Sequence, residues 1–356
     1  MDKRIYFLIN QELNKRNLKR FSYLALKRKG WKVSFFNFFY KPNKKSLRLE
    51  TYVKKNIFSI MKVFFSIHKN TFYCDITQRT FYEILLQFLL KFKNCKRFTI
   101  NIGNIPSVPK SGGITFSKFL KKIVHVFLLP TAEIAFTSGS IGRLKEREQK
   151  SKKIIDCHNL DYDFYLENKK NLKKNIITYI DQDFGNSIDF KMENIFFQEI
   201  KKFNLKIENF LKKMNKIQEV IVAGNPRRKV KRKLFKTKTV YGQINLLIKK
   251  SSLIITHNST TAQLAVLYKK PLLYIYTDET KKIDSLHLSS KSFAKELGLK
   301  LHNIKKISSK QIIKYKKKKI NLKKYTSYVK KYIKTSESSL VKSNIIIENE
   351  VIKYIE

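Results

Sequence analysis

The sequence predicts an α/β protein of two Rossmann-like domains that face each other across a cleft. Short apolar runs of strand length alternate with amphipathic stretches of helical spacing along its 356 residues. This alternation indicates parallel sheets, because a parallel crossover needs an intervening helix. The length suits two domains, and an Asn- and Lys-rich stretch at 167–175 separates two such series.

The first domain is expected over residues 1–168. It opens with the apolar strand "RIYFLIN", residues 4–10, and the helical pattern "QELNKRNLKRFSYLALKRKG", which ends on Gly30. The further expected elements are strand 31–39, helix near 50–67, strand 71–76, helix 79–94, strand 97–103, helix near 116–129 and strand 133–139. Gly and Pro residues make 103–113 a candidate lid or substrate loop.

The second domain is expected over residues 169–335, and a tail at 336–356 should end in a helix. Its apolar runs "NIITYIDQD", "EVIVAGNP", "LIITH" and "PLLYIY" have strand length, and "TTAQLAVLYKK" has helical spacing. The remaining expected elements are a helix near 194–216, a short strand at 238–242 and a helix at 243–251. The second domain is therefore also doubly wound.

The formal net charge of +49 comes from 76 Lys and Arg against 27 Asp and Glu. Lysine is spread along the whole chain, so a solvated lysine coat is the first interpretation. A groove for a polyanion such as nucleic acid, or contact with the anionic inner face of the plasma membrane, are the others. No apolar run reaches the roughly 18 residues of a membrane helix, and the N-terminal apolar run is too short for a signal peptide. We therefore expect a cytoplasmic protein.

The three cysteines, Cys74, Cys95 and Cys157, lie far apart and lack the paired spacing of metal ligands. An odd number also argues against a disulfide framework. We expect each to be a buried small side chain.

Polar side chains follow several expected strands, at the sheet edge where open α/β sheets bind ligands. After "LIIT" come His257, Ser259, Thr260 and Thr261, where a following helix would start. Hydroxyls and free N–H groups at such a start suit the phosphates of a nucleotide. The competing interpretation is that Ser259 or Thr260 only caps a helix and that His257 is an ordinary strand-end histidine.

Two further strand ends of the second domain carry polar residues. After "VIVAG" come Asn225, Arg227 and Arg228, and a guanidinium there suits a phosphate clamp, although a surface turn is the alternative. After "YI" come Asp181 and Asp183, which could bind a sugar hydroxyl, take part in proton transfer or cap a turn.

Four residues are candidates for proton transfer from the first domain and the domain boundary. His158, Asp161 and Asp163 stand in "CHNLDYDFYL" just before the boundary, and sites between domains commonly hold ligands. Asp75 ends the expected strand "FYCDI". A carboxylate or a histidine at these positions is a candidate general base.

The series "CHNLDYDFYL", "YIDQDF", "VIVAGNPRRK" and "LLIKKSSLIITHNSTTAQLAVLYKKPLLYI" resembles glycosyltransferases of bacterial surface-polysaccharide clusters, which make capsule and O-antigen. It is more distantly similar to GT-B transferases that use CMP-sugars or CDP-glycerol and carry a His-Pro and a Ser/Thr motif. The resemblance covers roughly residues 150–280. Ser259 and Thr260 match the donor-phosphate motif, His257 opens it, and Arg227 follows His-Pro, where this chain has Asn225 in place of the histidine.

The resemblance implies a GT-B-like enzyme whose second domain binds the donor and whose terminal helix packs back on the first domain. The expected function is transfer of a sugar or sugar-like unit from a nucleotide donor, of CMP or CDP type, to a cell-surface polysaccharide or its lipid-linked precursor. No metal and no further cofactor is expected. A nucleotide-binding or scaffold protein of polysaccharide assembly, which Asn225 favours, and a basic nucleic-acid-binding protein are the alternatives.

Overall fold

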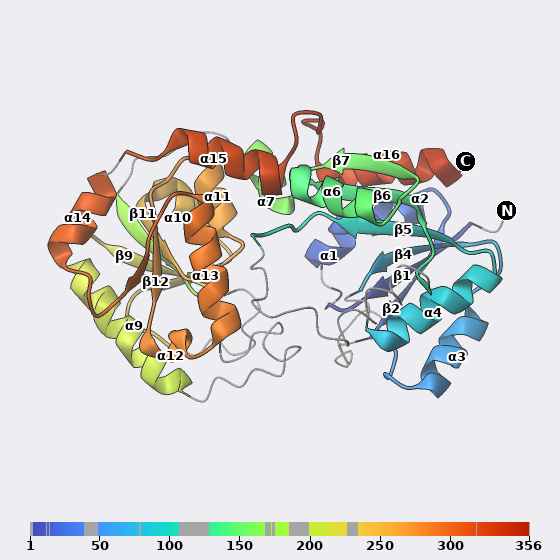
Figure 1. Ribbon diagram of the computed structural model, residues 1–356, viewed down its shortest axis with the longest axis horizontal. Helices are drawn as coiled ribbons and strands as arrows, with labels where there is room; N and C mark the ends of the chain where they lie inside the picture. The colour runs from blue at the N-terminus through green and yellow to red at the C-terminus, as the bar shows by residue number, and fades with distance from the viewer. Residues whose placement is uncertain are drawn as a thin grey trace. The chain divides into compact units, whose positions relative to one another are not determined.

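The structure is a computed structural model that describes residues 3–11, 13, 15–38, 49–77, 80–106, 128–167, 172, 175–184, 199–225, 234–317 and 319–355. The chain forms two compact units, each built on its own parallel sheet (Figure 1). Unit 1 comprises Met1–Asn104, Lys110–Leu160 and Lys331–Glu356, and unit 2 comprises Ile105–Pro109 and Asp161–Lys330. The predicted α/β class with two Rossmann-like domains is confirmed.

Unit 1 has a seven-stranded sheet in the order β3-β2-β1-β4-β5-β6-β7, and all its pairs are parallel. Its strands are β1 (Arg4–Ile9), β2 (Lys32–Asn37), β3 (Glu50–Tyr52), β4 (Phe72–Ile76), β5 (Lys96–Asn101), β6 (Ala132–Ser138) and β7 (Lys153–Cys157). Its helices are α1 (Lys15–Arg20), α2 (Tyr23–Arg28), α3 (Ile57–Ser66), α4 (Phe81–Phe92), α6 (Gly139–Glu148) and α16 (Ser343–Ile355).

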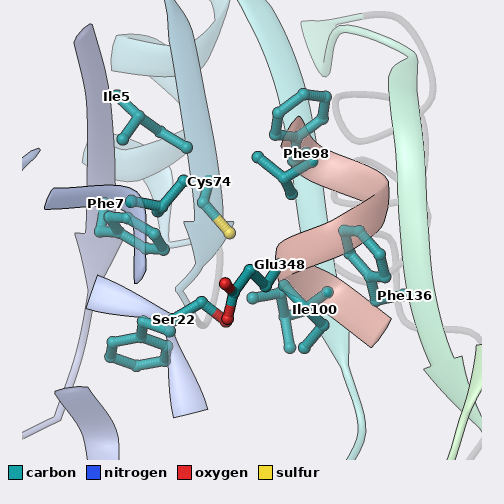
Figure 2. Close-up of a pocket in the computed structure, with 12 residues that line it drawn as sticks. Ile5, Phe7, Ser22, Cys74, Phe98, Ile100, Phe136 and Glu348 are labelled. Carbon is teal, nitrogen blue, oxygen red and sulfur yellow. The ribbon is translucent and has the colours of Figure 1, made fainter. Parts of the chain in front are cut away.

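Apolar clusters cover both faces of the unit 1 sheet. On one face, Ile347 and Val351 of α16 join the cluster that contains Phe7 and Phe98, so the terminal helix packs on unit 1 as expected. Figure 2 shows the space beneath α16, into which Cys74 and Glu348 point, and this cavity holds only about 10 Å³, close to the minimum for one water. Helices α3 and α4 cover the other face. All three cysteines are buried, as predicted, and none of them is in a disulfide.

Two expected helices of unit 1 differ from the structure. The helix expected over 11–30 is two short helices, because Ser22 between them takes a left-handed backbone conformation with φ 54°. The first residues of the helix expected near 50–67 form β3 instead, which pairs with β2, and α3 begins only after Asn56, whose side chain accepts a hydrogen bond from Ser59 N. The helix expected near 116–129 lies mostly outside the described residues.

Unit 2 has a six-stranded parallel sheet in the order β10-β9-β8-β11-β12-β13. Its strands are β8 (Ile176–Ile180), β9 (Val220–Gly224), β10 (Thr239–Tyr241), β11 (Ser251–Thr256), β12 (Leu272–Tyr276) and β13 (Leu301–Asn303). Its helices are α7 (Leu160–Glu167), α9 (Ile200–Asn215), α10 (Ile244–Lys250), α11 (Ala262–Leu267), α12 (Asp278–Lys281), α13 (Asp284–Glu296), α14 (Ser309–Lys317) and α15 (Leu322–Tyr328). The parallel strands expected at 220–223, 253–256 and 272–276 are confirmed.

The units change at Leu160 and Lys331, whereas the sequence placed domain borders at 168/169 and 335/336. Helix α7 belongs to unit 2 because the Tyr165 ring packs on Tyr268, with 5.2 Å between centroids. The π-helical turn η1 (Val329–Ile333) leads back into unit 1, where Ser138 Oγ donates to Tyr332 O at 3.4 Å. Gly139 makes this approach possible, because a Cβ on it would lie 2.3 Å from Lys331 O.

Among the described residues no helix is long and apolar enough to cross a membrane.

Candidate functional site

The strand order of unit 2 places its candidate site between β8 and β11. Numbered along the chain, the six strands lie in the order 3-2-1-4-5-6, so β8 is the first strand and β11 the fourth. The chain reverses its direction of winding there, and open α/β sheets bind ligands beyond the carboxyl ends of the strands at this switch point. The loops after Ile180 and Thr256 are the ones that border it.

A pair of amide side chains joins these two loops. Gln182 Nε2 donates to Asn258 Oδ1 at 2.5 Å, and Asn258 N donates back to Gln182 Oε1 at 3.0 Å. The two hydrogen bonds fix the loop after β8 against the loop after β11. Gln182 was not among the predicted site residues, although its position between two strand-end aspartates was a signal that could have found it.

Asp181 ties a third loop to the same edge. Its Oδ1 accepts from Asp183 N at 3.0 Å, and its Oδ2 accepts from Asn225 N, which follows β9, at a longer 3.5 Å. Asp183 itself is buried and has φ 49°, a left-handed conformation that aspartate tolerates in turns. Both aspartates therefore shape the loops, and the structure brings Asp181, Asp183 and Asn225 together as the sequence predicted for one sheet edge.

His257 lies in the core of unit 2, with 1% of its surface exposed. Its ring packs on Phe184 and Phe203, and its Nε2 lies 3.2 Å from Tyr179 Oη. Burial lowers its pKa to about 3, against a smaller opposite effect of a hydrogen bond to the Ile275 backbone. The ring is therefore neutral and buried, which contradicts the phosphate contact that the sequence predicted for it.

The three hydroxyl residues after His257 form a turn before α11. Ser259 and Thr261 are partly exposed and Thr260 is exposed, while Ser259 Oγ accepts from Thr261 N at 3.3 Å. The helix begins at Ala262, two residues later than expected, and has only six residues. Thr261 occupies the N-cap position without a capping hydrogen bond, so neither Ser259 nor Thr260 is a helix cap in the predicted sense.

Arg227 and Arg228, the predicted phosphate clamp, lie outside the described residues.

Asp75 is part of a buried ion pair in unit 1 rather than an available base. Arg97 Nη2 donates to Asp75 Oδ2 at 2.8 Å, and Thr77 donates to Oδ1 through its backbone N and its hydroxyl. Burial opposes the charge of Arg97, but the neighbouring carboxylate outweighs it and raises the arginine pKa. The sequence could not reveal this pair, because the two residues stand on separate strands.

His158 is fully buried in unit 1 and holds the C-terminal segment. Its Nε2 lies 2.8 Å from Val341 O, and its Nδ1 lies 3.0 Å from Ser343 Oγ at the start of α16. Both ring nitrogens thus have protein partners, which contradicts the proposed catalytic role and gives the histidine a structural one. Asp161 and Asp163 stand in the first turn of α7 in unit 2, where both are partly exposed.

A hollow of about 310 Å³ lies at the end of the unit 2 sheet that is opposite to the candidate site. It is lined by Pro271, Gly298, Tyr315 and Tyr325, among others. It stands at the amino ends of β12 and β13 and shares no residue with the candidate site. In the described part of the chain no group of three or more His, Cys, Asp or Glu side chains could hold a metal ion.

No family model and no curated protein matches the sequence. Solved structures are similar over the whole chain. The wall teichoic acid polymerase TagF matches 100% of this chain and 91% of its own at 13% identity, with a TM-score of 0.57. The glycosyltransferase SnogD from Streptomyces nogalater matches 99% of both chains at 12% identity, with a TM-score of 0.52. The UDP-GlcNAc 2-epimerase of Methanocaldococcus jannaschii, solved with UDP-GlcNAc and UDP, matches 99% of both chains at 12% identity, with a TM-score of 0.50. At such identities the likeness shows the fold alone, and this fold is the two-Rossmann arrangement of GT-B type.

Proposed function

We propose that the protein is a glycosyltransferase that moves a sugar or sugar-like unit from a nucleotide-activated donor to a cell-surface polysaccharide or its lipid-linked precursor. The observation that carries the proposal is the β8–β11 switch point, where Gln182 and Asn258 join two loops beside a partly exposed hydroxyl turn. Nucleotides bind at this position of Rossmann-like sheets. The likeness to a wall teichoic acid polymerase and to the glycosyltransferase SnogD supports it.

In this proposal unit 2 binds the donor. The hydroxyls of Ser259, Thr260 and Thr261 would donate to the donor phosphates, and Arg227 and Arg228 after β9 would balance their charge. We favour a CMP or CDP donor from the resemblance of the sequence motifs. The soaking of a TagF variant with CDPG supports a nucleotide of this kind.

The transfer step needs one base and a stabilised leaving group. The acceptor hydroxyl oxygen forms a bond to the transferred carbon, the bond from that carbon to the donor phosphate breaks, and the acceptor proton passes to a carboxylate. We propose Asp161 or Asp163 for this role, because Asp75 and His158 are committed to buried contacts. Hydroxyl and arginine donors around the departing phosphate would lower the barrier.

A second candidate is a nucleotide-binding scaffold protein of polysaccharide assembly. Asn225 favours it, since the resembling transferases have a histidine at this position and asparagine cannot become cationic. Such a protein would bind the donor nucleotide without turning it over. We place either protein in the cytoplasm, at the inner face of the plasma membrane.

The experiment is a thermal-shift screen of the whole chain against CMP, CDP, UDP, GDP and their sugars. A ligand present at 100 times its dissociation constant should stabilise unit 2 by roughly 2.7 kcal/mol. Calorimetric affinity for the best nucleotide is then compared between the parent and Ser259→Ala/Thr260→Ala. We expect at least a roughly tenfold loss, because the phosphate loses hydroxyl donors.

The matched control is Asn321→Ala, which removes the side-chain cap of α15 in the same unit. It should lower stability by about 1 kcal/mol and leave nucleotide affinity unchanged. If the double variant binds every nucleotide as the parent does, the donor site is wrong. If it binds more weakly but neither protein turns over any donor with an acceptor mixture, the scaffold function replaces the transferase.

A further inference from the structure

Helices α3 and α4 of unit 1 carry large apolar side chains on their outer surface. Phe58 is 81% exposed, Phe65 71%, Phe81 64% and Phe92 71%. These four side chains do not belong to the hydrophobic core. Other side chains of the same two helices, among them Ile60 and Leu86, form the core between the helices and the sheet. We call Ile57, Phe58, Phe65, Phe81 and Phe92 the phenylalanine surface.

The exposed rings lie in stripes. On α4, the exposed Phe81 and Phe92 and the partly exposed Leu85 and Phe88 follow each other at spacings of 4, 3 and 4 residues, which puts them on one side of the helix. The rings of Phe88 and Phe92 lie 5.2 Å apart, and the opposite side of the helix is buried. On α3, Phe58 and Phe65 stand seven residues apart, again on one side.

The two helices are neighbours on the same face of the sheet (Figure 1). Lys93, just after α4, donates to Phe64 O at 2.5 Å and to Ile67 O at 2.6 Å, so it joins the end of α4 to the end of α3. Its Nζ lies 4.4 Å from the Phe64 ring centroid. The connection ties the ends of the two helices together, and we call this pair of helices the platform.

The exposed charges of the segment that carries the platform have one sign. Five exposed lysines lie on or next to the two helices in the sequence: Lys54, Lys55, Lys62, Lys69 and Lys91. The acidic residues of the segment 51–95 are Asp75 and Glu83, and both are buried. The described part of this segment therefore presents lysine and phenylalanine to the outside without an exposed carboxylate.

We propose that the phenylalanine surface docks unit 1 on a bilayer of anionic lipids. Phenylalanine rings enter the boundary between headgroups and acyl chains, and lysines pair with anionic headgroups at the same depth. A second copy of this chain fits less well, since its own lysines would meet those of the first copy.

The placement also fits the proposed function, on which this last step rests. Helix α4 follows β4 in the sequence, and β4 together with β1 forms the switch point of the unit 1 sheet. Asn10, which follows β1, donates to Oε1 of Glu83 in the first turn of α4 at 2.9 Å. A lipid-linked acceptor held in the bilayer would then reach the acceptor-side unit at the edge where its loops lie.

The test is sedimentation of the whole chain with vesicles of phosphatidylcholine and phosphatidylglycerol, compared with phosphatidylcholine alone. Binding should require the anionic lipid and should weaken from 0.1 M to 0.5 M salt. Phe58→Ser/Phe65→Ser/Phe81→Ser/Phe92→Ser should lower the partition coefficient by at least roughly tenfold, because each ring loses its transfer out of water. Lys54→Gln/Lys62→Gln/Lys91→Gln should do the same through lost charge.

Matched controls carry the same kinds of change elsewhere. Leu144→Ser/Leu205→Ser/Leu322→Ser/Leu340→Ser removes four apolar side chains that are more than half exposed in other parts of the chain. Lys310→Gln/Lys314→Gln/Lys317→Gln removes three exposed lysines of α14. Both should keep parental vesicle binding.

Equal binding by the four-serine variant and the parent overturns the proposal. Equally strong binding of the parent protein to vesicles of phosphatidylcholine alone also overturns it. A third refuting outcome is that neither protein sediments with vesicles, while the parent is a dimer and the four-serine variant is a monomer. Nucleotide affinity of the four-serine variant stays parental in either case, which separates failure of this surface from failure of the donor site.

Discussion

Protonation of His257 should destabilise unit 2 as the pH falls. The ring is buried between Phe184 and Phe203, and burial lowers its pKa in the folded protein to about 3, compared with 6.5 for the unfolded chain. Below pH 6.5 the unfolded state binds a proton that the folded state refuses. The contribution of the neutral His257 ring to the stability of unit 2 is therefore complete above pH 6.5, and it is lost progressively as the pH falls to about 3.

The magnitude follows from the distance between the two pKa values. From pH 6.5 to pH 5 the loss from this one ring is about 2 kcal/mol, since each pH unit in this window contributes about 1.4 kcal/mol. His287 also has a lowered pKa, mainly through burial, but it is only partly buried and its effect should be smaller. Asp278, with a pKa of about 2 because of hydrogen bonds from Lys305 and Asn303, loses its contribution only at lower pH.

The assay is urea unfolding at pH 7.5, 6.5, 5.5 and 5.0. Trp31 is the single tryptophan of the chain and is buried in unit 1, so its fluorescence reports that unit. Far-UV circular dichroism reports both units, and the transition without a fluorescence counterpart belongs to unit 2. His257→Gln keeps a polar partner for Tyr179 but cannot titrate, so its unit 2 stability should change little over this range.

The matched control is His287→Gln, which should retain most of the parental pH dependence, because His287 is only partly buried. The unit 1 transition should be the same in all three proteins. If the parent and His257→Gln lose the same free energy of unfolding between pH 6.5 and pH 5, the His257 ring is not held neutral in the core of unit 2.

Three further outcomes follow from the buried contacts of unit 1. Arg97→Met should destabilise unit 1 by about 3–5 kcal/mol in urea unfolding followed by Trp31 fluorescence, because it leaves the Asp75 charge buried without its cation. Gly139→Ala should cost about 1–3 kcal/mol, since its φ is 64° and the new Cβ has no room. His158→Ala should raise hydrogen exchange throughout α16 without changing nucleotide affinity, because the ring holds the start of that helix.

Each of these three predictions has a control variant or an outcome that would contradict it. Arg97→Met combined with Asp75→Leu should recover most of the loss, and failure to recover would mean that the arginine acts through packing alone. Gly103→Ala places its Cβ in open space and should be nearly neutral. Parental exchange in α16 of His158→Ala together with lost transfer activity would restore the histidine to the catalytic candidates.

The sequence predicted most strands of the fold because their signal is local. "RIYFLI", "VIVAG" and "PLLYIY" are apolar runs of strand length, and all three are buried strands. The misjudged elements depended on other parts of the chain. β3 is a strand because β2 lies beside it, and the break between α1 and α2 depends on the backbone angle of a single serine. Periodicity carries neither kind of information.

The sequence could predict at which edge of the sheet the candidate site lies, but it could not predict which side chains contact each other there. Parallel topology requires the residues after β8, β9 and β11 to meet, and Asp181, Asn225 and Asn258 do so. Whether a polar residue at that edge faces outward or inward is decided by packing. His257 follows a strand, yet its ring lies among aromatic rings of the core. Asp75 lies near the end of a strand, yet it is paired with the buried Arg97.

The division of unit 1 between the two ends of the sequence affects how the protein is made. The ribosome releases residues 1–160 first, then Asp161–Lys330, the main part of unit 2, and only afterwards the segment from Lys331 onward. Until then the sheet face that Ile347 and Val351 cover, around Phe98, stays open to water and to chaperones. Unit 2 is a nearly continuous stretch and can complete its sheet while unit 1 waits. A nascent chain of this protein is thus most prone to aggregate while unit 2 is already folded and unit 1 still lacks α16.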